Sequence, residues 1–319
     1  MAISPEYISF SGAGNKQFPL FVNVKAYGAS GDGASDDAKA IQKALDGLSE
    51  TGGIIFFPKG TYLIKSYLYF YSNQTLYFEN GARLLQGAEM NALLIAYGTT
   101  ETTEYNGTHD VVIYGGIFDG GTEYTTHNTL LGLSHSRNIK IINCKFINSY
   151  GYWHNLEINS SEHVLVEGCE FEGLRKTAHN GCMLQIDSFY EEGCYPWGTG
   201  AVDNTICQHI EITRCRFYDN TASPGIGNHS NGGKNIRIHH CVFEGLTNDR
   251  GAINFYNKPD NINIDIYNNT FVGCSSGVTI PASPALSTVH DNRFIDTIAP
   301  IATSGITAYN NTIDGVLTN

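Results

Sequence analysis

Seven stretches of the chain share one pattern, in which apolar and polar residues alternate and are followed by a small or polar residue and a large apolar one. The seven stretches are Ile139–Phe146, Val164–Phe171, Ile210–Phe217, Ile236–Phe243, Ile264–Phe271, Val289–Phe294 and Ile306–Ile313. Alternation with a period of two is typical of β-strands that bury one face. The pattern therefore predicts a repeating β-structure.

One position of this pattern holds Cys or Asn in every stretch. The equivalent residues lie 19 to 28 positions apart, except for one step of 46, which we interpret as two coils. They are Cys144, Cys169, Cys215, Cys241, Asn269, Asn292 and Asn311. A repeat of about 20 to 50 residues indicates a solenoid, in which each unit buries its apolar face only against its neighbours. The sequence thus predicts an all-β solenoid.

The amino-terminal part of the chain follows a different pattern. Phe21–Val24 predicts a short strand, and a Gly-rich turn follows at Tyr27–Gly33. Ser35–Asp37 is then a good helix start, after which apolar residues recur at helical spacing. We expect a helix at about residues 36–50 that lies across the first coil and covers its unpaired backbone.

Composition and charge limit the function. The net charge of -12 argues against nucleic acid as a partner and favours neutral substrates over strongly anionic polymers. No run approaches ~20 apolar residues, so no membrane-spanning helix is expected. Residues 1–19 lack the basic start and apolar centre of a signal peptide. The protein is expected to be extracellular, after removal of a signal, or virion-associated.

The eight cysteines could suggest a disulfide framework. Four of them occupy the repeat position, however, where they are expected to stack as small apolar side chains inside consecutive coils. Cys194 and Cys207 bracket a loop and could form a bridge in an oxidising compartment. No metal is expected, although Asp187, Glu191 and Glu192 are clustered and leave calcium open.

Several motifs resemble those of a known family. Val22–Gln42 together with Gly52–Tyr62 resembles the opening of the pectate-lyase-like superfamily, and Ser72–Ala82 and Tyr114–Gly121 are similar to later motifs of its polygalacturonase branch. The superfamily includes polygalacturonase-type glycoside hydrolases, phage tailspike depolymerases, lyases and epimerases. The resemblance implies a single-stranded right-handed parallel β-helix whose long outer groove binds glycans.

The same resemblance sets the expected organisation of the chain. Residues 1–20 are expected to form an extension and residues 21–319 the β-helix domain, and the tailspike relatives make a homotrimer an open alternative. The Asn-Thr-Asp, Gly-His-Gly and Arg-Ile-Lys motifs of the polygalacturonase branch are absent. Because Arg-Ile-Lys grips a uronate carboxylate in that branch, the resemblance does not imply galacturonate as the substrate.

Upstream of each repeat, another strand is expected to form the parallel sheet that lines the groove. Its apolar residues point inward, as Cys182, Leu184 and Ile186 are expected to do, and alternate residues face outward. The excursion from Phe189 to Gln208 interrupts one coil. Counting back from the repeat position predicts one outward row on four successive coils, about 4.8 Å apart. Its members are Glu157, Asp187, His229 and Tyr256.

Two carboxylates on neighbouring coils suit glycoside hydrolysis. Repulsion between them raises the pKa of one, which supplies an acid beside a base. We predict Asp187 and Glu157 as the catalytic pair, with His229 tuning the acid or orienting a water. The residues expected to contact the sugar are Trp153, Asn155, His179, Gln185, Trp197, Asn254 and Tyr256.

Three functions remain open from the sequence. The first is a hydrolase of an extracellular or cell-envelope polysaccharide. The second is a polysaccharide lyase that eliminates on a uronate polymer, with Tyr256 or His229 as the base and Arg250 and Lys258 as nearby cations. The third is a non-catalytic glycan-binding phage adhesin, for which the aromatic side chains suffice. In each, the partner is a polysaccharide or oligosaccharide, and neither nucleic acid nor membrane is expected.

Overall fold

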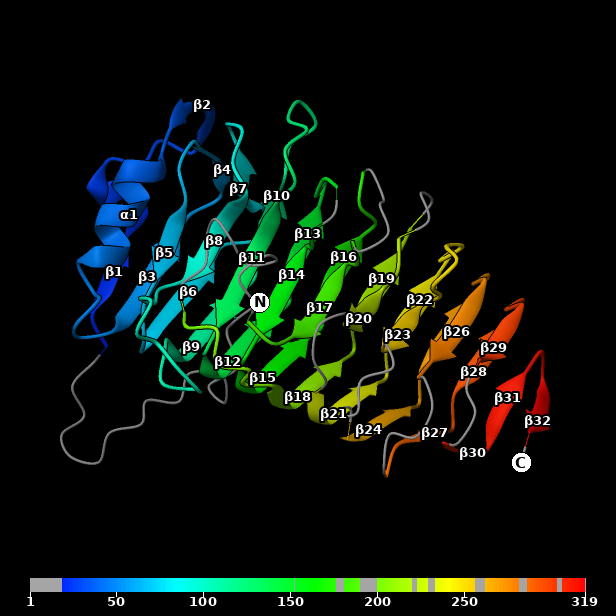
Figure 1. Ribbon diagram of the computed structural model, residues 1–319. Helices are drawn as coiled ribbons and strands as arrows, with labels where there is room; N and C mark the ends of the chain where they lie inside the picture. Colours follow the sequence, from blue (N-terminus) through cyan, green and yellow to red (C-terminus); the bar gives the residue numbers. More distant parts are fainter. Residues whose placement is uncertain are drawn as a thin grey trace.

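The computed structural model describes residues 19–151, 153–175, 181–189, 200–219, 223–228, 233–255, 262–280, 286–302 and 306–318. These residues form a parallel β-helix, in which three sheets run the length of the molecule and most coils contribute one strand to each (Figure 1). The amino-terminal helix lies at one end and the carboxyl-terminal strands at the other. The predicted all-β solenoid is confirmed.

The three sheets are defined here by their described strands. Sheet A contains β1 (Phe21–Asn23), β3 (Gly53–Phe57), β6 (Gln74–Phe78), β9 (His109–Tyr114), β12 (Arg137–Ile142), β15 (Glu162–Glu167), β18 (Cys207–Thr213), β21 (Gly233–His239), β24 (Ile262–Tyr267), β27 (Thr288–His290) and β30 (Thr307–Tyr309). Sheet B contains β2 (Asp32–Asp36), β4 (Gly60–Ile64), β7 (Ala82–Gln86), β10 (Ile117–Asp119), β13 (Lys145–Ile147), β16 (Glu170–Glu172), β19 (Arg216–Tyr218), β22 (Val242–Glu244), β25 (Thr270–Val272), β28 (Arg293–Ile295), β31 (Asn311–Ile313) and β32 (Val316–Thr318). Sheet C contains β5 (Leu68–Phe70), β8 (Ala92–Ala96), β11 (Thr129–Ser134), β14 (Leu156–Asn159), β17 (Leu184–Asp187), β20 (Ile226–Asn228), β23 (Ile253–Phe255), β26 (Ser276–Thr279) and β29 (Ala299–Ile301).

Each repeated stretch of the sequence contains one strand of sheet A, a sharp turn and one strand of sheet B. The turn residue has a left-handed backbone with φ between 54° and 71° in eight coils. Gly and Asn adopt this conformation at lower cost than most other residues. This requirement explains why most residues found at the turn are Gly, Asn, Asp or His, with Arg214 as the exception; they are Gly115, Asn143, Gly168, Arg214, His240, Asn268, Asp291 and Asn310.

The Cys or Asn after each turn points into the core. Cys144, Cys169, Cys215 and Cys241 are free and buried, as predicted, and burial raises the pKa of the Cys169 and Cys241 thiols. In the last coils Asn replaces Cys and bonds to the backbone, so that Asn292 Nδ2 donates to Ile266 O at 2.8 Å. The row therefore satisfies turn carbonyl groups that lie out of reach of water.

Large apolar residues stack inside the helix along its axis. Six phenylalanines in successive strands of sheet B have ring centroids 4.7 to 4.9 Å apart and nearly parallel planes. They are Phe146, Phe171, Phe217, Phe243, Phe271 and Phe294, all of which are fully buried. Each ring buries its faces against the two adjacent coils, so the stack fixes the coil-to-coil register from the inside.

A helix covers the amino-terminal end of the solenoid. The helix α1 (Ala38–Asp46) follows a short 3-10 helix, η2 (Val24–Tyr27), and buries Ile41 and Leu45 against the first coils. Gln42 accepts from Tyr69 N at 2.8 Å and donates to Tyr69 O at 3.1 Å, so its amide pairs with backbone of β5 at the edge of sheet C. The predicted cap is confirmed. No helix in the described ranges has the length and apolar character needed to cross a membrane.

The Asn row provides a test of this internal bonding. Asn292 is buried and also accepts from Asn269 N and Asn269 Nδ2, each at 3.0 Å. The substitution Asn292→Ala removes these two hydrogen bonds and the bond to Ile266 O from a buried row, so we expect the free energy of unfolding to fall by about 3 kcal/mol. The control is Asn80→Ala at an exposed position. Urea unfolding curves that coincide for the two variants would contradict the role of the row.

Candidate functional site

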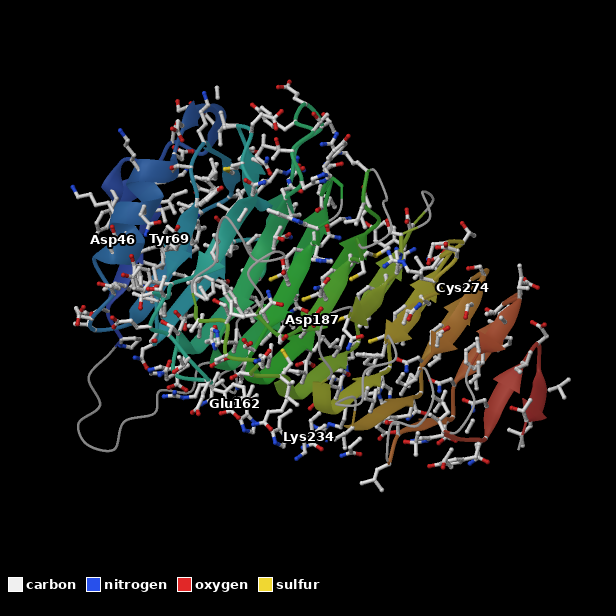
Figure 2. The ribbon with its side chains drawn as sticks, viewed as in Figure 1. Asp46, Tyr69, Glu162, Asp187, Lys234 and Cys274 are labelled. Carbon is white, nitrogen blue, oxygen red and sulfur yellow. The ribbon has the colours of Figure 1, made fainter. Side chains whose placement is uncertain are left out.

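A polar patch lies on the outward face of sheet C, about halfway along the helix axis. In the register of the sheet, Glu157 lies beside Gln185, and Asp187 lies beside Asn159. Figure 2 shows Asp187 in the middle of the molecule. The row that contains Glu157 runs through Tyr69, Ile95, Gly132, Glu157, Gln185, Gly227, Asn254 and Thr279.

The register corrects the expectation of a single row of Glu157 and Asp187. Two residues separate β14 from β15, whereas four separate β20 from β21. Counting back from the repeat position therefore misplaces a residue of β20 by two positions relative to a residue of β14. For Asp187, the count assigned the whole excess of its coil to the excursion from Phe189 to Gln208, whereas the pairing of β14 with β17 puts Gln185 beside Glu157, so Glu157 and Asp187 are diagonal neighbours. The other two members of the predicted row, His229 and Tyr256, lie outside the described residues.

Glu157 faces out of the core yet is only 1% exposed. Its Oε2 accepts from Thr129 Oγ1 and its Oε1 from Asn159 Nδ2, each at 2.9 Å. A buried carboxylate loses its hydration and needs such donors in compensation. The two bonds come from the coil before Glu157 and from its own strand, and they hold the carboxyl group in one orientation.

Asp187, at the end of β17, is fully buried. Its Oδ1 accepts from Ser188 N at 3.0 Å and its Oδ2 from Gln185 Nε2 at 3.1 Å. Its backbone carbonyl accepts from Cys207 Sγ at 3.1 Å. Cys207 is thus a free, buried thiol, and Cys194, its proposed disulfide partner, lies outside the described residues.

The strand before Asp187 contains an irregularity that the alternation did not reveal. Met183 and Leu184 both point into the core, so Cys182 is turned to the outward side, contrary to our expectation. Its Sγ lies 3.3 Å from His154 Nδ1, and burial raises the pKa of the thiol to about 12 while the charge of Arg250 opposes this shift. This contact places His154 beside the patch.

Arg250 is a half-buried cation close to this patch. Its Nη2 donates to Gly181 O at 2.6 Å, and its own carbonyl accepts from Asn254 Nδ2 at 2.9 Å. The sequence indicated Arg250 as a cation that flanks the groove and Asn254 as an outward residue of its alternating strand. Thr129 was missed because Leu130 and Leu131 of β11 both point inward, which breaks the period of two. His154 was missed because it lies before the start of β14, outside the alternating stretch.

The other residues that were expected to contact the sugar do not all lie on the outward face of sheet C. Trp153 is half-buried and packs against the outward pair of Ala92 and Ile95. Asn155 is fully buried and donates from Nδ2 to Glu172 O in sheet B at 2.7 Å, so it is not available on the outer face. His179 and Trp197 lie outside the described residues, as do Glu191 and Glu192, two of the three carboxylates considered for calcium.

Two loops that are distant in sequence meet at the edge of this face. The end of the excursion that follows β17 contacts the loop between β8 and β9: Glu104 N donates to Asp203 Oδ2 at 2.7 Å, and Tyr105 Oη to Ile206 O at 2.8 Å. The buried His135 lies between the loops, with its ring nitrogens 2.8 Å from Glu104 O and 2.9 Å from Ala201 O. These contacts join coils that are not adjacent in the sheet.

Two family models match the chain. Residues 21–188 match the family described as rhamnogalacturonase A/epimerase, pectate lyase-like, and residues 129–313 match the right handed beta helix region. Together they cover the capping helix and every strand named above except the short carboxyl-terminal β32. The handedness implied by the sequence resemblance is thereby confirmed.

Among curated proteins, the plasmin and fibronectin-binding protein A of Streptococcus pneumoniae is 30% identical over 195 residues, which are 54% of this chain and 27% of that protein. The preneck appendage protein of Bacillus phage PZA is 26% identical over 281 residues, 84% of this chain and 28% of that protein. The chain thus spans about a quarter of the length of these relatives.

Solved structures share the fold. The pneumococcal surface adhesin PfbA superposes with a TM-score of 0.75 at 21% identity, over 92% of this chain and 78% of that chain. An exopolygalacturonase from Thermotoga maritima gives a TM-score of 0.63 at 14% identity, over 93% of this chain and 81% of that chain. At these identities the likeness concerns the fold alone. From the two family models, the chain belongs to the rhamnogalacturonase A/epimerase, pectate lyase-like family of right-handed β-helix proteins.

Proposed function

We propose that this protein hydrolyses an extracellular or cell-envelope polysaccharide with Glu157 and Asp187 as its catalytic carboxylates. The observation that carries the proposal is the placement of two buried carboxyl groups as diagonal neighbours on the outward face of sheet C. The family fold is carbohydrate-active in its polygalacturonase-like members, which supports a glycan as the substrate. His229 remains the predicted supporting residue.

The diagonal relation selects a mechanism. Adjacent parallel strands lie about 4.8 Å apart and rise about 3.3 Å per residue, so the two Cα atoms are separated by about 8 Å. Inverting glycosidases hold their carboxyl groups about 6.5–9.5 Å apart, which leaves room for a water molecule, whereas retaining enzymes hold them about 5 Å apart. We therefore infer an inverting reaction.

The hydrogen bonds suggest which carboxyl group has which role. Asp187 accepts from the backbone N–H of Ser188, which orients its carboxyl group for the role of a general base that activates water. Glu157 lies against the Thr129 hydroxyl, which can donate to a carboxylate or accept from a carboxylic acid. Glu157 can therefore hold a proton and deliver it to the glycosidic oxygen.

The burial of both carboxyl groups sets a condition on this proposal. Glu157 is 1% exposed and Asp187 is 0% exposed, so this face has to open before a polymer reaches them. Enzymes commonly open and close loops over a site that excludes water, and such motion can limit turnover. Opening would expose the two carboxyl groups together, because they share one patch.

A second function is favoured by the similarity to PfbA, whose structure is described as that of a surface adhesin. In this alternative the β-helix binds a glycan and does not cleave it, and the face with the buried Glu157 and Asp187 does not need to open. The phage appendage relatives are compatible with the same alternative. The two functions differ in whether glycosidic bonds are broken, which the following experiments measure.

Removal of either carboxyl group tests the hydrolase. We expect Asp187→Asn and Glu157→Gln each to lower the release of reducing ends from the cleaved polysaccharide by about a hundredfold or more, since each removes an acid or base. Glu162→Gln, a carboxyl group at the start of β15, is the matched control and is expected to keep wild-type activity. The measurement is a reducing-end assay across a panel of neutral and uronate polysaccharides.

Full depolymerisation by Asp187→Asn would remove this assignment. Binding by the wild type without any cleavage across the panel would favour the adhesin. Products with unsaturated ends that absorb in the ultraviolet would identify a lyase instead, with Arg250 as a cation close to the patch.

The diagonal spacing predicts the stereochemistry of the product. We expect the newly formed reducing end to have the anomeric configuration opposite to that of the cleaved bond, because strand positions about 8 Å apart are compatible with the wider carboxyl separation of inverting enzymes. Proton NMR of the anomeric signals in the first minutes of reaction measures this. An initial product with retained configuration would show that the two carboxyl groups approach more closely than their strands indicate.

A further inference from the structure

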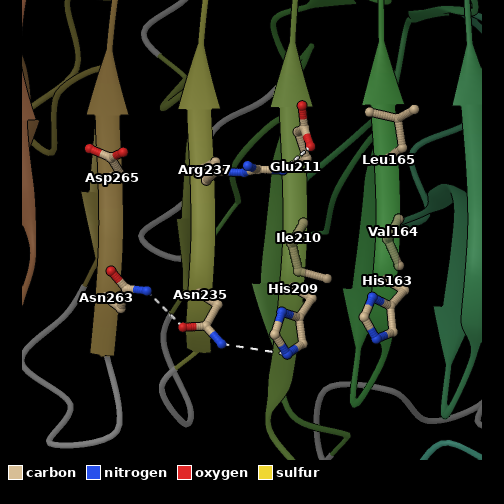
Figure 3. Close-up of a pocket in the computed structure, with 10 residues that line it drawn as sticks. All are labelled: His163, Val164, Leu165, His209, Ile210, Glu211, Asn235, Arg237, Asn263 and Asp265. Carbon is tan, nitrogen blue, oxygen red and sulfur yellow. Dashed lines mark hydrogen bonds and ion pairs between the residues drawn. The ribbon is translucent and has the colours of Figure 1, made fainter.

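A second polar site lies on sheet A, away from the face that carries Glu157 and Asp187. The side chains of four successive strands, β15, β18, β21 and β24, surround a shallow hollow of about 510 Å³ (Figure 3). Four of its residues form one line across the strands, and an ion pair and a carboxylate lie beside them. The line consists of His163, His209, Asn235 and Asn263.

This line has a common backbone geometry. Its four residues have φ between 53° and 56°, a left-handed conformation that Asn and His tolerate better than most other residues. The backbone requirement accounts for Asn and His as residue types, but it does not require the contacts that their side chains make with one another. His163, His209 and Asn263 are exposed, in contrast to the buried carboxyl groups on sheet C.

The side chains of the line contact one another from coil to coil. Asn263 Nδ2 donates to Asn235 Oδ1 at 2.8 Å, and Asn235 Nδ2 lies 3.5 Å from His209 Nε2. The rings of His163 and His209 are stacked, with centroids 4.7 Å apart and planes 5° from parallel. Stacked rings turn their edges outward, so the hollow presents planar groups with nitrogen and oxygen atoms at their rims.

The charged groups of the hollow are matched. Arg237 forms an ion pair with Glu211, whose other oxygen lies 3.1 Å from His239 Nε2. Asp265 accepts from Thr288 Oγ1 and lies 3.1 Å from His290 Nε2. Each of these three charged lining residues has a partner of opposite or compatible charge. A ligand in the hollow would therefore meet mainly amide and imidazole groups, and no large net charge.

We propose that this hollow is a second binding site, which takes a neutral stretch of a polysaccharide lying along the axis of the helix. Sugar hydroxyl groups both donate and accept, and so do the Asn amide and neutral imidazole groups of the line. A chain along the axis meets an equivalent polar group at each coil, about every 4.8 Å. Leu165 adds an apolar surface on the same face.

The inference rests on the proposed function only in taking the polymer as the ligand. A site that is exposed while the carboxyl groups are covered can hold the polymer before the catalytic face opens. Holding one part of a chain raises the effective concentration of the rest near the molecule. The hollow would therefore lower the polymer concentration needed for cleavage and leave the chemistry itself unchanged.

The experiment measures binding in an Asp187→Asn background, so that cleavage does not interfere. The probes are neutral hexasaccharides of glucose, galactose, mannose and rhamnose, with a hexamer of galacturonate for comparison. Ring-proton NMR signals of the histidines, assigned with His163→Gln and His209→Gln, report contact at the hollow. We expect one neutral hexamer to shift both signals, and the double substitution His209→Ala with Asn235→Ala to weaken its binding about tenfold.

The matched control is Asn268→Ala, at an exposed left-handed position in the turn between sheets A and B and outside the hollow, which is expected to keep the affinity. Absence of a shift with every neutral hexamer, binding by the uronate alone, or equal affinity in the double variant would each overturn the inference. A shift without any cleavage by the wild type would sustain this site and refute the hydrolase. Cleavage without a shift would do the reverse.

Discussion

The stacking of each coil on its neighbour is the interaction on which every other feature of this protein depends. Inside the helix, the phenylalanine stack and the Cys and Asn row bring equivalent atoms to the same place once per coil. The left-handed turn between sheets A and B makes this return possible within very few residues. Because the register between coils is fixed inside the helix, the relative positions of the side chains that face outward are fixed as well.

The candidate sites use this register in two ways. On sheet C, the pairing of β14 with β17 places two carboxyl groups diagonally, and amide and hydroxyl groups from neighbouring positions hold them. On sheet A, four residues of one line repeat a single geometry and contact one another along the axis (Figure 3). One face is buried and the other exposed, so the same scaffold offers a protected site and an accessible one.

The interior of this fold was predictable from the sequence because it is periodic. Phe146 and Cys144 recur with their equivalents in each repeat, and burial allows them little variation. The site was predictable only in part. Turn length between sheets C and A does not follow the repeat, so the row of Glu157 could not be counted, and the two consecutive inward residues at Met183 and Leu184 hid Cys182 on the outward side. Local irregularities of this kind depend on how a strand packs against the adjacent coils. The alternation of residues within one strand carries no information about that packing.

The cap at the amino-terminal end has a consequence for how the chain folds. Gln42 pairs with the backbone of β5, and α1 covers the first coils, so the cap leaves the ribosome before the later coils and gives them a closed starting surface. Every later coil pairs in parallel with the coil made just before it. Domains generally fold from the amino terminus during synthesis, and solenoids propagate order from neighbour to neighbour. Assembly can therefore proceed in the direction of translation, with each finished coil acting as the template for the next.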